Sequence, residues 1–219
     1  MNKQTKLFDL MEKNFLALLS QIYYNIFDSI IALKRDDDGL LKSQICEVFI
    51  GVDAFSRYNK ILEGMDEKDL DKDNKERFTS WLNNFVLTEK NEVYREHKGE
   101  LNIDAGKLWI LRNSLVHYYG LPPVSKMGAS FGLSGGDADV IHDRVRKFKE
   151  LGNKAIILIH PTWLIKACLH GFLLQLDSMK RMIVDSPSIY VERIRKAHRI
   201  IIEEGGVMVS TDGKVAKYW

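Results

Sequence analysis

The sequence predicts a mainly α-helical protein that carries a small β appendage. Apolar residues recur at spacings of three and four over most of the first 120 residues, which is the period of one helix face. Strand character is confined to 128–134, 155–159 and the C-terminal tail, where Asp212–Gly213 is typical of a tight hairpin turn. We expect these strands to form one small sheet.

Length and composition bound the class of protein. The 219 residues are 45% hydrophobic and 28% charged, which allows a packed core and excludes a disordered chain. Two cysteines exclude a disulfide scaffold and the cysteine-rich zinc modules. Neither a secretory leader nor an apolar segment of membrane-spanning length is recognisable, so we expect a cytoplasmic protein without a membrane span. We expect one domain over 1–219, with core helices over 1–123 and the β appendage plus two packing helices over 124–219.

The net charge of +2 is distributed unevenly along the chain. Residues 1–100 carry 15 basic and 19 acidic side chains, whereas residues 101–219 carry 17 and 11. The mildly basic second half permits a polyanionic partner, although a solvated surface is the simpler explanation.

Caps and apolar periodicity place the helices. We predict helices over about 5–34, 42–63, 74–86, 104–120, 161–182 and 186–204. Gly64 follows the second helix, and Pro161 opens the fifth. Residues 88–101 are ambiguous and compatible with a polar helix, and residues 137–153 contain a short basic amphipathic piece.

The helix over 104–120 is the best punctuated. Asp104 stands at the N-cap position, Gly120 stands at the C-cap position, and Pro122–Pro123 prevent the helix from continuing. One side of this helix carries an ordinary core stripe, formed by Leu108, Leu111, Leu115 and Tyr118.

The opposite side of this helix is also apolar but carries a polar cluster. Its residues are Trp109, Ile110 and Val116, with Arg112, Asn113 and His117 between them. Asn113 and His117 are four residues apart and therefore neighbours on the helix surface, and Arg112 has the reach to join them. A helix that is apolar on two sides is buried on two sides, so we expect this cluster in a partly dry cleft that faces a second helix or a second subunit. Such a cleft suits phosphate binding and proton transfer by an imidazole.

The residues alone leave two interpretations of this cluster open. It can be a functional site, or it can be a structural trio that satisfies buried hydrogen bonds. The spacing itself is weak evidence, because Arg193 and His198 repeat it on a basic helix that we interpret as solvated surface. The first pair differs in its apolar surroundings and in the Gly-Leu-Pro that follows it.

The segment LWILRNSLVHYYG resembles the signature helix of the HEPN superfamily (higher eukaryotes and prokaryotes nucleotide-binding). The motif of that family is Arg, four to six residues, then His, often with a polar residue directly after the Arg. The segment EVFIGVDAFSRY resembles the family's second helix, and FTSWLNNF resembles an aromatic helix of some uncharacterised members. The resemblance covers roughly 40–121, and it does not cover the β appendage or the last two helices.

The resemblance implies a HEPN-like helical bundle, a homodimer through the helix 104–119, that cleaves RNA without a metal ion or a cofactor. It implies that Arg112, Asn113 and His117 are the catalytic residues. His117 would take the proton of a ribose 2′-hydroxyl, Arg112 would neutralise the pentacovalent phosphate, and Asn113 would orient His117 or donate to a phosphate oxygen.

The resemblance also implies partners. Many HEPN members are endoribonucleases, including toxins of toxin–antitoxin pairs, so we expect RNA or a nucleotide as ligand and an antitoxin or another protein as a further partner. Other members have lost cleavage. The alternative function is therefore a non-catalytic dimer that binds a nucleotide, an RNA or a partner protein.

Further residues are candidates for contact with the substrate. Asp53 on the second helix can orient the site, or it can pair with Arg57 four residues later. Glu47 is a weaker candidate of the same kind. Lys107 and Tyr118 flank the motif and can touch a nucleic-acid backbone, although Lys107 is typical of plain surface.

The other chemical signals are weaker. The glycines of 128–136 lack the Gly-Lys-Ser/Thr and the strand–loop–helix spacing of a phosphate loop, so we interpret them as a turn. Cys46, Cys168, His160 and His170 show no metal-ligand spacing, so we predict no metal site. We assign both cysteines to the core.

Overall fold

The computed structural model describes most of the chain from residue 41 to residue 186, together with short segments on either side. The described residues are 20, 23–28, 30, 41–66, 69–70, 72–118, 120–151, 155–186, 189–190, 192–197, 208–209 and 215–216.

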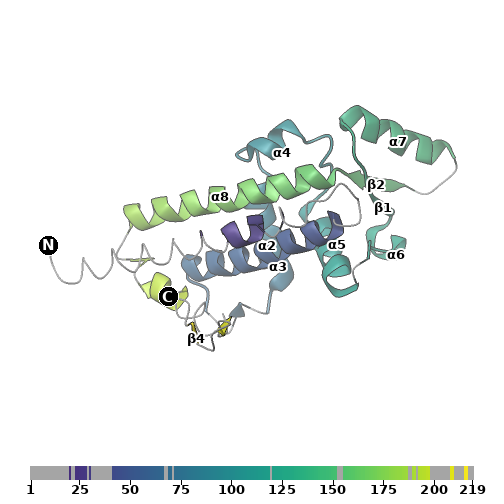
Figure 1. Ribbon diagram of the computed structural model, residues 1–219. Coiled ribbons are helices and arrows are strands. Elements are labelled where there is room, and N and C mark those ends of the chain that lie inside the picture. The colour runs from purple at the N-terminus through teal and green to yellow at the C-terminus, as the bar shows by residue number, and fades with distance from the viewer. Residues whose placement is uncertain are drawn as a thin grey trace, which may run out of the picture.

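A bundle of helices forms the body of the molecule (Figure 1). α2 (Leu41–Glu63) runs beside α8 (Pro161–Asp185). α3 (Asn74–Trp81) packs against α2, and the π-helix η3 (Leu82–Val86), which continues α3, packs against α8. α5 (Ala105–Tyr118) lies against both α2 and α3. The prediction of a mainly α-helical protein is confirmed, and the helix predicted over 74–86 changes to π geometry in its last turn.

The core of this bundle is aromatic. Phe49 and Phe55 of α2, Phe78 and Trp81 of α3 and Phe172 of α8 are at most 2% exposed. The ring centroids of Phe55 and Phe172 lie 4.5 Å apart, and those of Phe49 and Phe78 lie 5.8 Å apart. Burial of this apolar surface, at roughly 25 cal/mol per Å², is the main force that holds α2, α3 and α8 together.

α8 approaches η3 closely at Gly171. A Cβ atom on this residue would meet the carbonyl oxygen of Phe85 at 3.1 Å, so a larger side chain would press on the π-helix backbone. Buried polar side chains also join α8 to α2 and α3. Gln175 Nε2 donates to the Phe55 carbonyl at 2.9 Å, and the indole N–H of Trp81 donates to Gln175 Oε1.

α4 (Glu92–Glu96) is a single short helix within the ambiguous stretch 88–101, and turns follow it. The fully buried Asn91 explains its position. The Asn91 side chain accepts from the backbone N–H of Tyr94 at 3.1 Å and donates to the Ala167 carbonyl at 2.8 Å. The same amide therefore caps α4 and joins it to α8.

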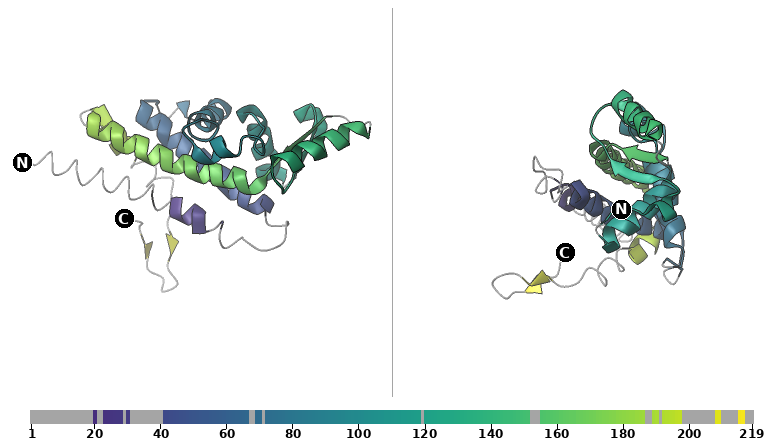
Figure 2. Two further views of the ribbon diagram at one scale, coloured as in Figure 1. Left: turned by 90° about the horizontal axis from the view of Figure 1, so that it is seen from above. Right: turned by 90° about the vertical axis from the view of Figure 1, so that its right-hand side faces the viewer.

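Two short strands form a parallel sheet where the sequence predicts strands. β1 (Ser130–Leu133) pairs with β2 (Ile156–Ile159), and α7 (Ala138–Glu150) connects them. The register places Ser130 opposite Ile156 and Leu133 opposite Ile159. Figure 2 shows this β–α–β unit projecting from one end of the bundle. The helix α7 is longer than the short amphipathic piece that we expected.

The C-terminal strands form a separate sheet. β3 (Met208–Val209) and β4 (Val215–Ala216) pair antiparallel with each other, as a hairpin requires. Our expectation of one sheet is wrong, because the described strands form two independent two-stranded sheets. The predicted turn at Asp212–Gly213 lies outside the described residues.

The outer helices are described in part. Residues 23–28 are helical, as predicted, and Ile26 and Ile30 are buried. Residues 189–190 and 192–197 are helical as well. The remaining parts of the helices predicted over 5–34 and 186–204 lie outside the described residues. Within the described part of the chain, every helix is too short or too polar to cross a membrane.

Candidate active site

α5 presents the motif residues, and it begins where the sequence predicts. Asp104 Oδ1 accepts the backbone N–H of Lys107 at 2.8 Å, which is the expected N-cap hydrogen bond. At the other end, the Gly120 N–H donates to the Ser114 carbonyl at 3.2 Å. The φ angle of Gly120 lies outside the left-handed range, so the predicted glycine C-cap is not of the left-handed type.

The core stripe of α5 is shorter than predicted. Leu108, Leu111 and Leu115 are buried, but Tyr118 exposes 76% of its surface. The assignment of Tyr118 to the core is wrong, because this residue belongs to the last turn of the helix, where the neighbouring helices no longer cover the stripe. An exposed tyrosine in this position is available to a ligand.

A carboxylate from α2 anchors Arg112. Arg112 Nε donates to Asp53 Oδ2 at 2.9 Å, and Nη2 forms an ion pair with the same oxygen. The two side chains expose only 18% and 21% of their surfaces. The Trp109 ring lies 5.3 Å from the guanidinium carbon and adds a cation–π contact. Asp53 therefore positions Arg112, and a carboxylate held in this way is a poor contact for a phosphate.

The remaining guanidinium nitrogen joins the other two motif residues. Arg112 Nη1 donates to Asn113 Oδ1 at 2.9 Å and lies 3.4 Å from His117 Nε2. Because a guanidinium can only donate, a hydrogen bond between these two groups uses His117 Nε2 as the acceptor. The structure thus brings together the three residues that the sequence singles out.

The members of this cluster differ in their exposure. Arg112 and Asn113 are half-buried, whereas His117 is exposed to solvent. The imidazole also meets the ring of Tyr118 edge-on, with the ring centroids 6.3 Å apart. The structure therefore supplies a fixed cation beside an imidazole that a ligand can reach.

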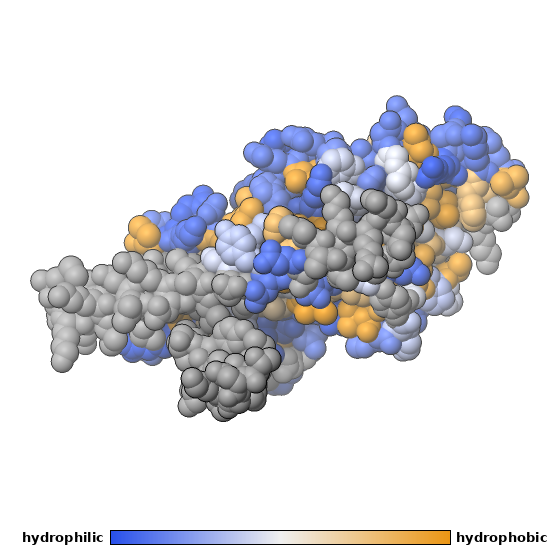
Figure 3. Space-filling view, in the orientation of Figure 1, coloured by the Kyte–Doolittle hydropathy of each residue, from blue (hydrophilic) through white to orange (hydrophobic). Residues whose placement is uncertain are grey.

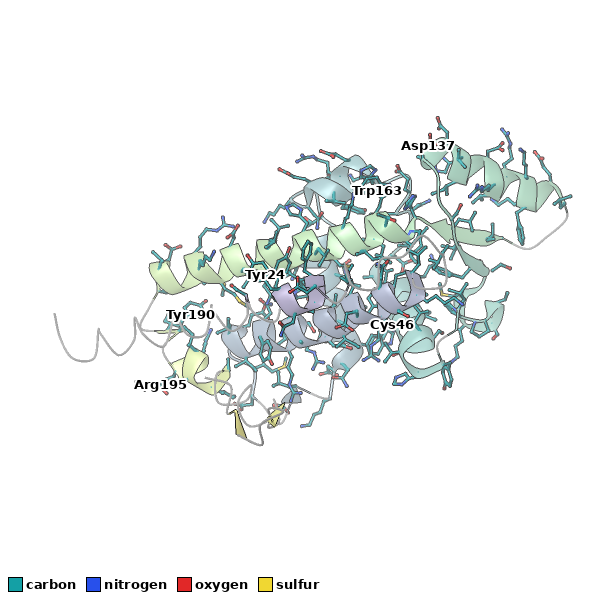
Figure 4. The ribbon with its side chains drawn as sticks, viewed as in Figure 1. Tyr24, Cys46, Asp137, Trp163, Tyr190 and Arg195 are labelled. Atoms are coloured by element: carbon teal, nitrogen blue, oxygen red, sulfur yellow. The ribbon has the colours of Figure 1, made fainter. Side chains whose placement is uncertain are left out.

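A groove of about 570 Å³ lies between α2 and α5, and His117 belongs to its lining. Cys46, which Figure 4 labels, lines the groove together with Glu47 and Tyr118. Burial, and to a smaller extent the charge of Glu47, raises the pKa of the Cys46 thiol. The thiol is therefore protonated at neutral pH and is a poor nucleophile.

The two cysteines occupy different environments. Cys168 is fully buried, which raises the pKa of its thiol and agrees with the predicted core position. Cys46 is only half-buried and packs against the edge of the core, so its assignment to the core is wrong in part.

Sequence reasoning missed Lys126. This residue lies on α6 (Val124–Met127), which packs against α5. Lys126 Nζ lies 5.9 Å from the centroid of the Tyr118 ring, and the amine forms no ion pair with any residue that the structure describes. The sequence signal for Lys126 is Pro122–Pro123. These prolines force the chain to turn directly after α5, so the residues that follow can fold back against that helix.

Lys107 lies away from the cluster. Its Nζ pairs with Asp104 Oδ2 at 2.8 Å in the first turn of α5. Ten residues separate it from His117, which corresponds to about 15 Å along the helix axis. This placement agrees with the plain-surface interpretation of Lys107.

The second Arg–His spacing has a structural role. Arg193 Nη1 donates to the Leu62 carbonyl at 2.8 Å and so satisfies the C-terminal end of α2. The guanidinium carbon also lies 5.5 Å from the centroid of the Tyr190 ring. The interpretation of Arg193 as solvated surface is therefore wrong, and His198 lies outside the described residues.

Another group of titratable side chains surrounds Trp163 (Figure 4). His97 stacks on Trp163 with ring centroids 3.5 Å apart, and Lys166 Nζ lies 4.3 Å from the indole centroid. His97 Nδ1 lies 3.2 Å from Glu100 Oε1. Burial lowers the pKa of the neighbouring His160. Among the described residues, no group of three or more His, Cys, Asp or Glu side chains is arranged to hold a metal ion.

Comparison of the chain with protein-family models, with curated proteins and with solved structures finds no match. The resemblance to the HEPN superfamily therefore rests on the sequence segments that carry it.

Proposed function

We propose that this protein is a metal-independent endoribonuclease of the HEPN type. The observation that carries the proposal is the exposed His117 imidazole, 3.4 Å from a guanidinium that Asp53 and Trp109 hold in place. A general base next to a fixed cation is the pair of groups that an RNA phosphodiester needs when its own 2′-hydroxyl attacks it.

The reaction starts at the nucleotide on the 5′ side of the scissile phosphate. His117 Nε2 accepts the proton of the 2′-hydroxyl while the 2′-oxygen forms a bond to phosphorus. The bond from phosphorus to the 5′-oxygen of the next nucleotide breaks, and this oxygen takes up a proton. The products are a 2′,3′-cyclic phosphate and a 5′-hydroxyl, so one proton is removed and one is supplied.

Arg112 stabilises the negative charge that develops on the phosphate. A phosphate oxygen replaces His117 as an acceptor for Arg112 Nη1, which frees His117 Nε2 for the 2′-hydroxyl. Asp53 holds Nε and Nη2 throughout, so the guanidinium keeps its place while Nη1 changes partner. Asn113 accepts from Arg112 through Oδ1, which directs its amide nitrogen to a phosphate oxygen.

The proposal includes a homodimer, because apolar side chains are exposed near the site. Leu121 and Val124 expose 36% and 37% of their surfaces. Apolar side chains also gather on the surface at the α5–α6 end of the molecule (Figure 3). A second copy on this face would bury them and bring a second His117 close to the first, where its protonated form supplies the proton of the leaving oxygen.

The structural alternative fits the exposure of His117 less well. If the trio only satisfied buried hydrogen bonds, His117 would be shielded from solvent, as Arg112 is. The non-catalytic binding alternative uses the same contacts and differs only in turnover.

Cleavage of a mixed RNA pool in EDTA tests the proposal. We expect wild type and the control His142→Ala, which alters an exposed histidine on α7, to cleave at equal rates. His117→Ala should lose at least about 100-fold in rate, the usual contribution of a general base. Cleavage by His117→Ala at the wild-type rate would contradict the proposal. RNA binding without cleavage in wild type would favour the binding module.

A further inference from the structure

We infer that the groove between α2 and α5 is a binding pocket for a guanine base. The inference rests on the proposed ribonuclease function and adds a substrate preference to it. His117 is part of the groove lining, so a base in the groove belongs to a nucleotide whose ribose lies within reach of the motif. We expect this nucleotide to supply the attacking 2′-hydroxyl.

Glu47 selects the base. This half-buried carboxylate lines the groove and makes no hydrogen bond or ion pair with any residue that the structure describes. A carboxylate only accepts hydrogen bonds. Guanine is the RNA base that presents two adjacent donors, N1–H and the 2-amino group, to two oxygens at once. Adenine and cytosine place a ring acceptor next to their amino group, and uracil places a carbonyl on each side of its single N–H.

The rest of the groove suits a flat purine. Its other lining residues include the apolar Ile50 and Val116, and its volume lies within the usual range of small-molecule sites, about 300–1,000 Å³. The exposed ring of Tyr118 supplies an aromatic face at the same place.

The charges around the groove fit one nucleotide. Glu47 faces the base, while Lys126 Nζ lies 5.9 Å from the Tyr118 ring and can pair with a flanking phosphate. A second copy of the chain is a poorer occupant, because covering Glu47 with an apolar face would bury a carboxylate without a partner. A base inserted in the groove cannot be paired, so the expected substrate is single-stranded RNA.

Binding of nucleoside 3′-monophosphates to the full chain tests the inference without relying on cleavage. We expect isothermal titration calorimetry to show guanosine 3′-monophosphate binding about 10- to 100-fold more tightly than adenosine 3′-monophosphate, the discrimination of one bidentate pair. Inosine 3′-monophosphate, which lacks the 2-amino group, should fall between them. Equal affinities for guanosine and adenosine, or no binding of any of the three, would overturn the inference.

A matched pair of variants assigns the preference to Glu47. Glu47→Gln keeps the size of the side chain and should abolish the preference for guanosine. Glu63→Gln lies on the same helix, about 24 Å further along its axis, and should keep it. A guanosine preference that survives in Glu47→Gln would overturn the inference.

Mapping of cleavage sites in single-stranded RNA separates the two proposals. Cleavage on the 3′ side of guanine by wild type supports both of them. Cleavage without base preference would overturn the guanine pocket and leave the ribonuclease intact. Selective guanosine binding without any cleavage would overturn the ribonuclease and leave the pocket intact.

Discussion

Arg112 and His117 lie five positions apart on one helix but have different environments. Arg112 is half-buried with its carboxylate partner Asp53, whereas His117 is exposed. Removal of a buried charge partner destabilises a fold, whereas truncation of an exposed side chain does not. Stability and activity should therefore respond differently at these two positions.

We expect Arg112→Ala to lower the free energy of unfolding by about 1–3 kcal/mol, because it leaves Asp53 without its charged partner. His117→Ala should change it by less than about 0.5 kcal/mol. Urea denaturation measures both values. A loss above 1 kcal/mol in His117→Ala would favour the structural trio over the active site.

His160 gives a prediction about pH. Burial lowers the pKa of His160, with smaller contributions from Glu100, which raises it, and from His97 and Lys166, which lower it. Between the lowered pKa and the ordinary value of about 6.5, the unfolded chain binds a proton that the folded chain does not. Stability should therefore fall as the pH drops below about 6.5.

Thermal melts between pH 5 and pH 7.5 test this prediction on wild type and His160→Gln. The Tm of wild type should fall more steeply toward pH 5 than that of His160→Gln. Parallel curves for the two proteins would show that another group titrates in this range.

The sequence predicts the local part of the site and misses its tertiary part. Arg112, Asn113 and His117 are neighbours through helix geometry alone, so their spacing is sufficient to find them. The partner of Asp53 depends on how two helices cross, so the sequence pattern slightly favours Arg57 on the same helix, whereas the structure pairs Asp53 with Arg112. Lys126 reaches the site only because the chain folds back after α5.

At the scale of elements, the helix ends are better predicted than the packing. Asp104 begins α5 and Gly64 terminates α2, both as predicted, because a capping residue acts within one turn of its helix. The π-helix η3, the exposure of Tyr118 and the separation of the two sheets depend on contacts distant in sequence. The spacing of apolar residues along the sequence predicts which face of a helix is buried, but not which distant segment covers it.

The contact of α8 with η3 gives a prediction at Gly171. We expect Gly171→Ala to lower the free energy of unfolding by about 1–3 kcal/mol, because the new methyl group would press on the Phe85 carbonyl at 3.1 Å. Gly106→Ala is the control, since its Cβ would meet only a side-chain oxygen, that of Asp104 at 3.2 Å. Urea denaturation that shows Gly171→Ala as stable as the control would contradict this account of the contact.

The junction of α5 and α6 gives a prediction about salt. If Lys126 contacts a phosphate, Lys126→Gln should reduce the slope of log affinity for single-stranded RNA against log salt by about 0.7. Lys180→Gln on α8, where the lysine pairs with Asp177, should leave the slope unchanged. Fluorescence anisotropy at several salt concentrations measures the slope. Equal slopes for the two variants would show that Lys126 does not contact a phosphate of the RNA.

At the scale of the whole molecule, the proposal requires a second copy on the apolar face near the site. We expect wild type to sediment as a dimer and Val124→Asp, which places a charge on that face, to sediment as a monomer. Leu151→Asp is the control, because Leu151 is 79% exposed on the projecting β–α–β unit. A dimer that survives in Val124→Asp would place the interface elsewhere.

The terminal groups of the RNA products show whether the 2′-hydroxyl of the RNA is the nucleophile and whether His117 is its base. Wild type, incubated with a single-stranded RNA in EDTA, should leave 2′,3′-cyclic phosphate and 5′-hydroxyl ends, and His117→Ala should form them at least about 100-fold more slowly. Products with 5′-phosphate ends, or cyclic phosphates formed equally well by His117→Ala, would rule out the proposed reaction.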